Sequence, residues 1–277
     1  GMLMVADSWH HRILGWKCVP TASGAAPDFA IGQPNLDSIE PNAGGGPTAC
    51  SLYWPYGFAW IDGWFWVADT GNRRVLGWRG IPSGLAPADV ILGQPGPEDR
   101  EENRGRGPGP RSFRWPHAVA GDESVFLVAD AGNHRVLGWT PAPQQDADAG
   151  LVLGQSSFAT NTEFPYAQQS AAKLRFPYAV SLDSGRLAVA DTANNRVLFW
   201  NAASGLGCGQ EAGAVIGQDD FAANGENRWK AVTRDSLCWP YGLCLWGDRL
   251  ATADSGTTCI MIWDVSESFA TANSASV

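Results

Sequence analysis

The sequence predicts an all-β protein built from repeated antiparallel sheets, and three observations support this prediction. The segment VADTGNRRVLGW at 67–78 recurs four more times, and consecutive aspartates of the five copies lie 62, 61, 61 and 63 residues apart. Glycine (33 residues), proline (18) and tryptophan (14) are abundant, while charged residues make up only 17%. Short apolar runs bounded by Gly, Pro, Asn and Asp are typical of strands joined by tight turns. A fixed period of this length indicates a repeat architecture.

Each copy of this segment predicts a β-hairpin. In the copy at 67–78, one strand at 64–69 ends at the aspartate and the next spans 74–78. The TGN between them tolerates the positive φ that a tight reversal needs. The other copies are VADSWHHRILGW at 5–16, VADAGNHRVLGW at 128–139, VADTANNRVLFW at 189–200 and the more divergent TADSGTTCIMIW at 252–263.

Two further sequence features, which we call marks, recur with the same period and complete the repeat unit. An aromatic–proline step followed by an apolar run precedes each later copy, at 54–55, 115–116, 176–177 and 239–240. A run ending in Gly-Gln follows the first four copies, with its glutamine at 33, 94, 155 and 218. One unit therefore predicts four strands, which in the second unit are 56–61, 64–69, 74–78 and 89–94. Several such four-stranded antiparallel sheets arranged radially form a β-propeller.

Five units predict five blades within a single domain at 1–277. The units are about 1–33, 54–94, 115–155, 176–218 and 239–277. The first unit lacks the strand after the aromatic–proline step, and the last lacks the Gly-Gln strand, so only the middle three are complete. The alternative is a propeller of six blades, which would require the tail or another chain to supply the additional strands.

Connections of 20 residues join the units, at 34–53, 95–114, 156–175 and 219–238. Loops of this length are often functional. The connection at 95–114 is charged and rich in Gly and Pro, which predicts mobility. In a propeller these connections lie on the same face as the turns that follow the aspartates, and this loop face is where a ligand is expected.

The string ADTGNxRVLxW, placed after an aromatic–Pro–x–Gly strand, resembles the NHL repeat, a family of propeller blades. The resemblance covers all five units. The Gly-Gln tail, as in VILGQPGPED, is similar to a bacterial variety of this repeat. The resemblance implies the propeller fold, for which six blades is the commoner number in this family. It implies no single function, because such blades serve many unrelated roles.

Charge and cysteine content restrict the classes of partner and compartment. The net charge of −9 disfavours nucleic acid and anionic membrane surfaces as partners. The six cysteines form no CxxC pair and do not follow the repeat, which favours free thiols in a reducing compartment. No signal peptide is visible, and no apolar run reaches the ~18–20 residues of a membrane helix. These features predict a cytoplasmic protein.

In the first four copies an arginine follows the aspartate by five residues. The pairs are Asp7/Arg12, Asp69/Arg74, Asp130/Arg135 and Asp191/Arg196. Side chains at this spacing can meet across a tight hairpin, and such regular repetition predicts a structural role. The fifth copy has Cys259 in place of the arginine. Asp254 and Cys259 therefore mark either a degenerate terminal repeat or a functional departure.

Catalytic signatures are weak. The four histidines, His10, His11, His117 and His134, show no HxH or HxxxH spacing, and zinc needs three or four converging ligands. We therefore predict no metal and no cofactor, with a divalent metal on the propeller axis as the alternative. His11 and His134 occupy the variable position before the repeat arginine, which predicts an exposed turn. A GxSxG motif and a nucleotide-binding loop are both absent.

Aromatic residues provide the candidate ligand contacts. The residue after each aromatic–proline step is Tyr56, His117, Tyr178 or Tyr241, at the entry to the innermost strand. These rings either pack between blades or line a polar-aromatic pocket at the channel mouth. The periodic tryptophans (Trp16, Trp78, Trp139, Trp200 and Trp263) predict core. Trp229 and the other tryptophans outside the period (Trp9, Trp60, Trp64, Trp66 and Trp246) are candidates for a binding surface.

The sequence features together favour a non-catalytic binding function. The hypothesis is a scaffold that recognises a protein or peptide through its loop face, because interfaces favour Trp, Tyr and Arg anchors. The alternative is a metal-dependent enzyme of lyase or hydrolase type with its site at the central axis.

Overall fold

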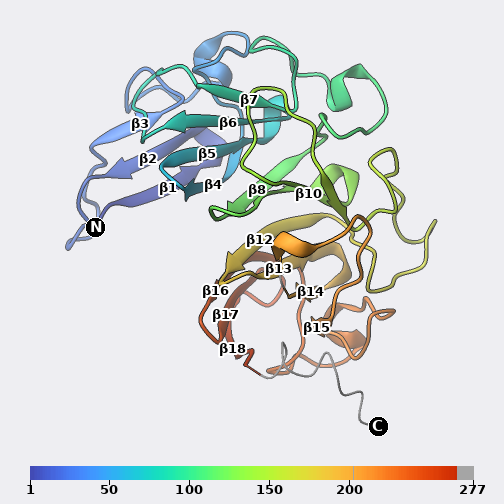
Figure 1. Ribbon diagram of the computed structural model, residues 1–277. Helices are drawn as coiled ribbons and strands as arrows, with labels where there is room; N and C mark the ends of the chain where they lie inside the picture. Colours follow the sequence, from blue (N-terminus) through green and yellow to red (C-terminus); the bar gives the residue numbers. More distant parts are fainter. Residues whose placement is uncertain (202, 267–277) are drawn as a thin grey trace. The chain divides into compact units, whose positions relative to one another are not determined.

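The computed structural model describes residues 1–201 and 203–266, and strands dominate it (Figure 1). These residues form five antiparallel sheets, which are the five blades of a β-propeller fold, as the sequence predicts. They contain no α-helix and no sixth sheet. None of the helices in this part of the chain has the length and hydropathy of a membrane span.

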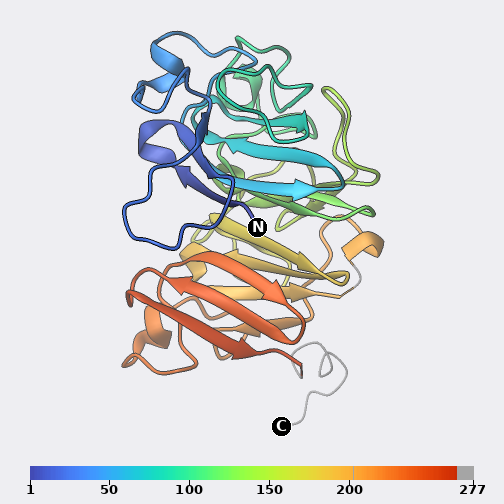
Figure 2. The same cartoon turned by 90° about the vertical axis from the view of Figure 1, so that its left-hand side faces the viewer.

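The number of strands per blade differs between the middle and the ends. Among the described residues three blades have four strands, whereas the first and the last have three, as the incomplete units at the two ends of the repeat predict. The first blade contains β1 (Leu3–Asp7), β2 (Arg12–Trp16) and β3 (Phe29–Ile31). The last contains β16 (Pro240–Trp246), β17 (Arg249–Asp254) and β18 (Cys259–Asp264), drawn in orange and red in Figure 2. The rest of the last predicted unit, 267–277, lies outside the described residues.

The three middle blades follow the predicted order of strands. Their strands are β4 (Pro55–Ile61), β5 (Trp64–Asp69), β6 (Arg74–Arg79) and β7 (Val90–Leu92); β8 (Pro116–Gly121), β9 (Phe126–Asp130), β10 (Arg135–Trp139) and β11 (Leu151–Leu153); and β12 (Pro177–Asp183), β13 (Arg186–Asp191), β14 (Arg196–Trp200) and β15 (Ala214–Ile216). The outer strand is shorter than the predicted 89–94. The positive φ of Gly93 (92°) turns the backbone out of the ladder there.

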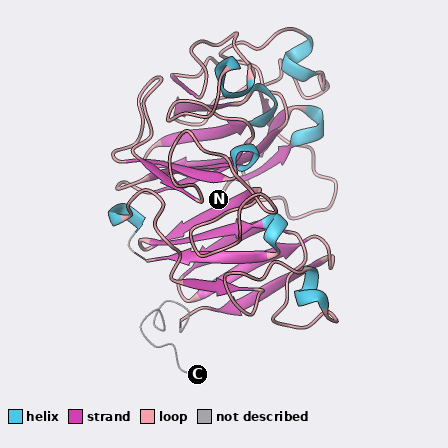
Figure 3. Ribbon diagram, turned by 90° about the vertical axis from the view of Figure 1, so that its right-hand side faces the viewer, coloured by secondary structure: helices cyan, strands magenta, loops and turns pink. Residues whose placement is uncertain are grey.

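Short 3₁₀ helices occupy the ends of strands and the loops, as the cyan segments of Figure 3 show. They are η1 (Ser8–His10), η2 (Pro41–Gly44), η3 (Thr70–Asn72), η4 (Glu102–Gly105), η5 (Ala131–Asn133), η6 (Thr192–Asn194), η7 (Ala203–Gly205) and η8 (Glu226–Trp229). Four of them replace the simple turn that the sequence predicted after each aspartate. In η3 the N–H of Arg73 donates to the carbonyl of Thr70 (3.1 Å), and Arg73, rather than Gly71 or Asn72, adopts the positive φ (55°). Gly71 is required instead by a close approach, because a Cβ there would lie 2.5 Å from the ring of Tyr53.

Backbone contacts divide the chain into two compact units. The first comprises 1–118 and 143–148 and holds the first two blades. Its apolar core combines side chains of both blades, namely Ile13, Ile31, Leu52, Phe65, Val67, Leu76, Trp78 and Ile91. Trp66 is also fully buried in this unit, so the expectation that it lies at a binding surface is wrong.

The second unit comprises 119–142 and the chain from 149 onward. Its core combines side chains of the fourth and fifth blades, namely Ala188, Val197, Phe199, Leu237, Leu245, Leu250 and Val265. The periodic Trp139 and Trp200 are buried here, as predicted for core positions, whereas Trp263 at the edge strand β18 is only half-buried. Whether the whole chain is a single domain, as the period suggests, stays a prediction.

The Gly-Gln mark anchors the long loops. The buried side chain of Gln94 donates to the carbonyl of Glu101 (2.9 Å), seven residues later. Further along this loop, the N–H of Asn103 donates to the carbonyl of Phe113 (2.9 Å), and both residues are buried. The same backbone bond recurs from Asn42 to Leu52 and from Asn227 to Leu237. The expected mobility of 95–114 does not fit these contacts, because buried anchors hold both ends of the loop.

Candidate functional site

The repeated aspartate and arginine form ion pairs across their hairpins. Arg Nε lies 2.7–2.9 Å from Asp Oδ2 in each of the four pairs. The side chains of Asp69/Arg74, Asp130/Arg135 and Asp191/Arg196 are fully buried, whereas Asp7 and Arg12 are partly exposed. The Arg74 guanidinium also donates to the carbonyls of Ser51 (2.9 Å) and Pro97 (2.6 Å). The pair therefore ties its hairpin to the loops before and after the blade, which favours the structural interpretation.

Burial raises the pKa of the Asp69 carboxyl, while the Arg74 guanidinium opposes this shift. The amide of Tyr53 (2.7 Å) and the side chain of Asn72 (2.8 Å) also donate to this carboxylate. The same balance applies to Asp191, whose pKa burial raises and Arg196 lowers. A buried ion is tolerated when it is paired and hydrogen-bonded in this way.

The fifth copy lacks the arginine, and its aspartate is held differently. Asp254 is buried, and burial raises its pKa. The amide of Cys238 donates to one carboxylate oxygen (2.8 Å), and the hydroxyl of Thr257 donates to the other. Cys259 Sγ lies 3.0 Å from the same hydroxyl. Thr257 thus supplies one hydrogen bond where the three middle copies have an Asn and an Arg, an arrangement compatible with a degenerate terminal repeat.

The rings after the aromatic–proline steps lie in pairs within each unit. In the first unit Tyr56 and His117 stack with centroids 4.4 Å apart and planes at 14°. In the second, Tyr178 and Tyr241 are 4.7 Å apart and tilted by 40°. Both pairs are partly accessible to solvent, so packing and ligand contact both stay open as their role. Trp229, the fifth candidate, is 79% exposed and lies over Gly225 in the loop before β16.

The predicted exposure of His11 and His134 is wrong, because both side chains are buried. Nδ1 of His11 accepts a hydrogen bond from the amide of Trp54 (3.2 Å), and Nδ1 of His134 accepts one from the amide of Phe176 (3.2 Å). Asn195 Oδ1 accepts the equivalent bond from Trp239 (2.9 Å). The position before the repeat arginine therefore supplies an acceptor for the aromatic–proline step of the next blade.

This role predicts a pH dependence of stability. Burial lowers the pKa of His11 below its ordinary value of about 6.5, although Glu40 opposes the shift. A depressed folded-state pKa contributes stability that is fully present above about pH 6.5 and is lost as the pH falls toward the folded-state pKa. His11→Asn, which copies Asn195, should reduce this loss. Urea unfolding at pH 7.5 and 5.5 measures it; equal losses in both proteins would contradict the assignment.

One cluster in the first unit combines exposed and half-buried aromatic and basic side chains. We call it the aromatic–arginine site; it comprises Trp9, Tyr53, Trp54, Arg73 and Arg100. Trp9, in η1, is 73% exposed and meets Trp54 edge-on, with centroids 5.9 Å apart. Trp54 in turn lies 4.6 Å from the ring of Tyr53. Two segments far apart in the sequence thus build one continuous aromatic surface.

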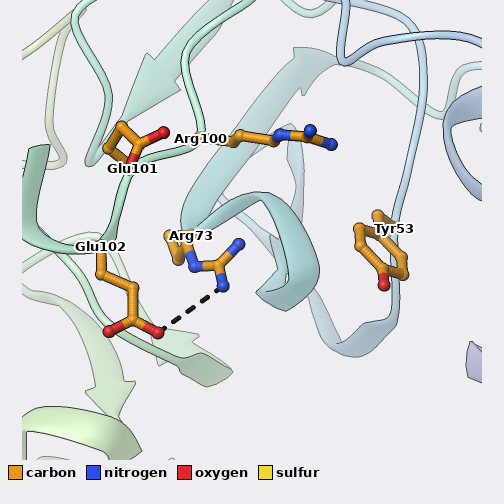
Figure 4. Close-up of a pocket in the computed structure, with 5 residues that line it drawn as sticks. All are labelled: Tyr53, Arg73, Arg100, Glu101 and Glu102. Atoms are coloured by element: carbon orange, nitrogen blue, oxygen red, sulfur yellow. Dashed lines mark ion pairs between the residues drawn. The ribbon is translucent and has the colours of Figure 1, made fainter. Parts of the chain in front are cut away.

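A hollow of about 510 Å³ adjoins this surface, lined by Tyr53, Arg73, Arg100, Glu101 and Glu102 (Figure 4). The Arg73 guanidinium donates to the carbonyl of Gly71 (2.7 Å) and lies 3.6 Å from a Glu102 oxygen. Arg100 extends toward Tyr53 in Figure 4 and forms no ion pair with any described residue. A guanidinium in this position can bind a carboxylate or phosphate oxygen.

One departure from the repeat in the sequence marks this site. Arg73 stands where the other copies have His, His, Asn and Thr, and it cannot accept a hydrogen bond from the next aromatic–proline step. The repeat is therefore broken at this position. Tyr53 and Arg100 belong to loops whose contact with Arg73 depends on folding. Among the described residues, no group of three or more His, Cys, Asp or Glu side chains has an arrangement suited to a metal ion.

Comparison with known proteins adds information on the fold. No protein-family model matches the sequence, and no curated protein matches it. The chain is similar to the solved structure of U3-55K, with a TM-score of 0.50 and 12% identity over 95% of this chain. It spans 59% of the U3-55K chain. It is also similar to the crystal structure of the computationally designed Ika4 protein (TM-score 0.41, 8% identity, 80% of this chain and 94% of that one). At these identities the first likeness concerns the fold alone.

Proposed function

We propose that this chain is a non-catalytic binding propeller of the NHL-repeat type, which recognises a protein or peptide through its loop face. The observation that carries the proposal is the aromatic–arginine site. Trp, Tyr and Arg are the residues that dominate binding energy at protein interfaces. Trp9 offers a large rigid surface at its exposed face, and Arg100 offers an uncommitted guanidinium beside a hollow.

The charges of the site suggest the kind of peptide it takes. Arg73 shares Glu102 with Arg114, whose Nε lies 3.3 Å from the other Glu102 oxygen. Of the two arginines that line the hollow, Arg100 is therefore the one whose guanidinium we expect to bind a ligand. A peptide with an apolar or aromatic side chain for Trp9 and a carboxylate for Arg100 complements these groups.

The test is selection from a random peptide library on immobilised protein, followed by affinity measurement of the enriched peptides. We expect Trp9→Ala to weaken binding about 30-fold or more, which corresponds to about 2 kcal/mol. Arg100→Ala should weaken binding of peptides that contain Asp or Glu and leave others unchanged. The matched control is Trp60→Ala, because Trp60 is 55% exposed and lies outside the site. No enriched peptide, or equal losses in the Trp9 and Trp60 variants, would overturn the proposal.

A further inference from the structure

The segment that leads into β16 carries two accessible tryptophan side chains beside a glutamate. Trp229, at the end of η8, is 79% exposed, and Trp239 is 39% exposed. The indole N–H of Trp239 donates to Oε1 of Glu226 (3.1 Å). The ring of Trp229 rests on Gly225, the residue before Glu226, and a Cβ at Gly225 would lie 2.5 Å from that ring. Both indoles therefore lie beside Glu226, and all of these residues belong to the second unit.

Trp229 and Gly225 depart together from the pattern of the first two long loops. Counted from the Gly-Gln mark, the position of Trp229 is glycine in those loops (Gly44 and Gly105). All three residues have a positive φ, which is 56° for Trp229, 83° for Gly44 and 69° for Gly105. The position of Gly225 holds a glutamate in both of those loops. A bulky residue rarely adopts this backbone conformation, and strain of this kind clusters at functional sites. The exchange presents an indole to solvent at a position suited to glycine.

The charge of Glu226 is not neutralised by a neighbouring cation. The equivalent glutamate of the second long loop, Glu102, lies 3.6 Å from Arg73 and 3.3 Å from Arg114. Before the last blade, an asparagine and a cysteine occupy the positions of these two arginines. Arg228, two residues beyond Glu226, is paired with two aspartates of its own loop instead. Glu226 thus forms no ion pair with any described residue, and one of its oxygens is left to accept a hydrogen bond from a ligand.

We propose that Glu226, Trp229 and Trp239 form a binding site for a basic side chain, arginine or lysine, of a partner protein. An indole face attracts a cation through its ring quadrupole, and tryptophan does so more strongly than tyrosine or phenylalanine. The Glu226 carboxylate accepts a charge-assisted hydrogen bond from the same cation. The net charge of −9 raises the concentration of cationic segments near the chain. We call this the indole–carboxylate site; it does not depend on peptide binding at the aromatic–arginine site.

An NMR titration of the full chain with a capped Gly-Arg-Gly peptide tests the proposal. We expect the indole N–H signal of Trp239, identified by its absence from Trp239→Phe, to shift and saturate. The same peptide with neutral citrulline in place of arginine should bind about 10-fold more weakly, because it keeps the shape of arginine and loses the charge. The proposal is wrong if the arginine peptide causes no saturable shift, or if the citrulline peptide binds equally well.

A matched pair of charge variants separates this site from general attraction to an acidic protein. Glu226→Gln keeps an acceptor for the Trp239 indole and removes the charge, so it should weaken binding of the arginine peptide about 5-fold or more. Glu211→Gln removes the same charge from another exposed residue of the second unit, and it should change the affinity by less than about 2-fold. Equal losses in the two variants would overturn the proposal.

Trp229→Gly restores the residue that the first two long loops have at this position. It should therefore fold with unchanged stability in urea unfolding and bind the arginine peptide about 5-fold more weakly or less. A loss of stability with binding retained would assign the ring to packing and overturn the proposal. Trp9→Ala, at the aromatic–arginine site, should leave the affinity for the arginine peptide unchanged, so failure of this site is distinguishable from failure of the proposed function. Loss of arginine-peptide binding in Trp9→Ala would place that binding elsewhere and contradict the assignment.

Discussion

Asp130→Ala should lower the free energy of unfolding by about 3–5 kcal/mol. The substitution leaves the Arg135 guanidinium buried without its carboxylate, whose Oδ2 lies 2.9 Å from Arg135 Nε. It also removes the acceptor of the Asn133 side chain (2.7 Å). Removing one partner of a buried ion pair is expensive because the remaining charge keeps its desolvation penalty. Urea unfolding followed by tryptophan fluorescence measures the loss.

The chain supplies a matched control for this experiment in its first copy. Asp7 and Arg12 form the same pair, but their side chains are 21% and 12% exposed. Asp7→Ala should therefore cost about 1 kcal/mol or less, because water can solvate the arginine left behind. If the aspartates instead served a ligand, Asp130→Ala would leave stability unchanged and reduce peptide binding, and the structural interpretation would fail.

Gln155→Leu should lower the free energy of unfolding by about 2–5 kcal/mol. The buried Gln155 side chain donates to the carbonyls of His134 (3.1 Å) and Thr162 (2.9 Å) and accepts from the Thr162 amide (3.1 Å). Leucine fills a similar volume but leaves these backbone groups without their partner. A buried donor or acceptor left unsatisfied costs about 1–3 kcal/mol.

Gln168→Leu is the control, because Gln168 is exposed in the same long loop. Its effect should stay within about 0.5 kcal/mol. Limited proteolysis gives a second measure: losing the Gln155 anchor should expose 156–175 to cleavage at Lys173 or Arg175 at a higher rate. Unchanged stability and unchanged cleavage of the Gln155 variant would show that the Gly-Gln mark does not hold the loop.

The strands and their order could be predicted from the sequence because they depend on local patterns. The strand predicted at 64–69 has the predicted bounds, since a short continuous apolar run ends there at an aspartate followed by turn residues. The three-stranded first and last blades of the described residues were also predictable, because no aromatic–proline step precedes the first copy of the hairpin and no Gly-Gln run follows the last.

Contacts between segments far apart in the chain depended on tertiary structure. The sequence places His11 in a turn, and turns are usually exposed. In the structure the rings of Tyr53 and Trp54 pack against His11, and the amide of Trp54, 43 residues later, donates to it. Trp9 and Trp66 look alike in sequence as tryptophans outside the period. Trp9 is exposed in η1, whereas Trp66 is buried in β5. The difference depends on which side chains are covered by neighbouring segments, and only folding decides this.

The aromatic–arginine site shows the same division. Its members come from four segments, namely the turn that contains Trp9, the stretch at Tyr53 and Trp54, the turn that ends at Arg73, and the loop that contains Arg100. Sequence alone determined that these are two turns after the repeat aspartates, an aromatic–proline step and a long charged loop. Only the tertiary structure decided that Tyr53, Arg73 and Arg100 line one hollow beside Trp54 and Trp9. The hydrogen bond from the buried Gln94 to Glu101 holds the loop that carries Arg100. A one-dimensional period encodes each blade, whereas a site assembled from several loops depends on how neighbouring blades pack.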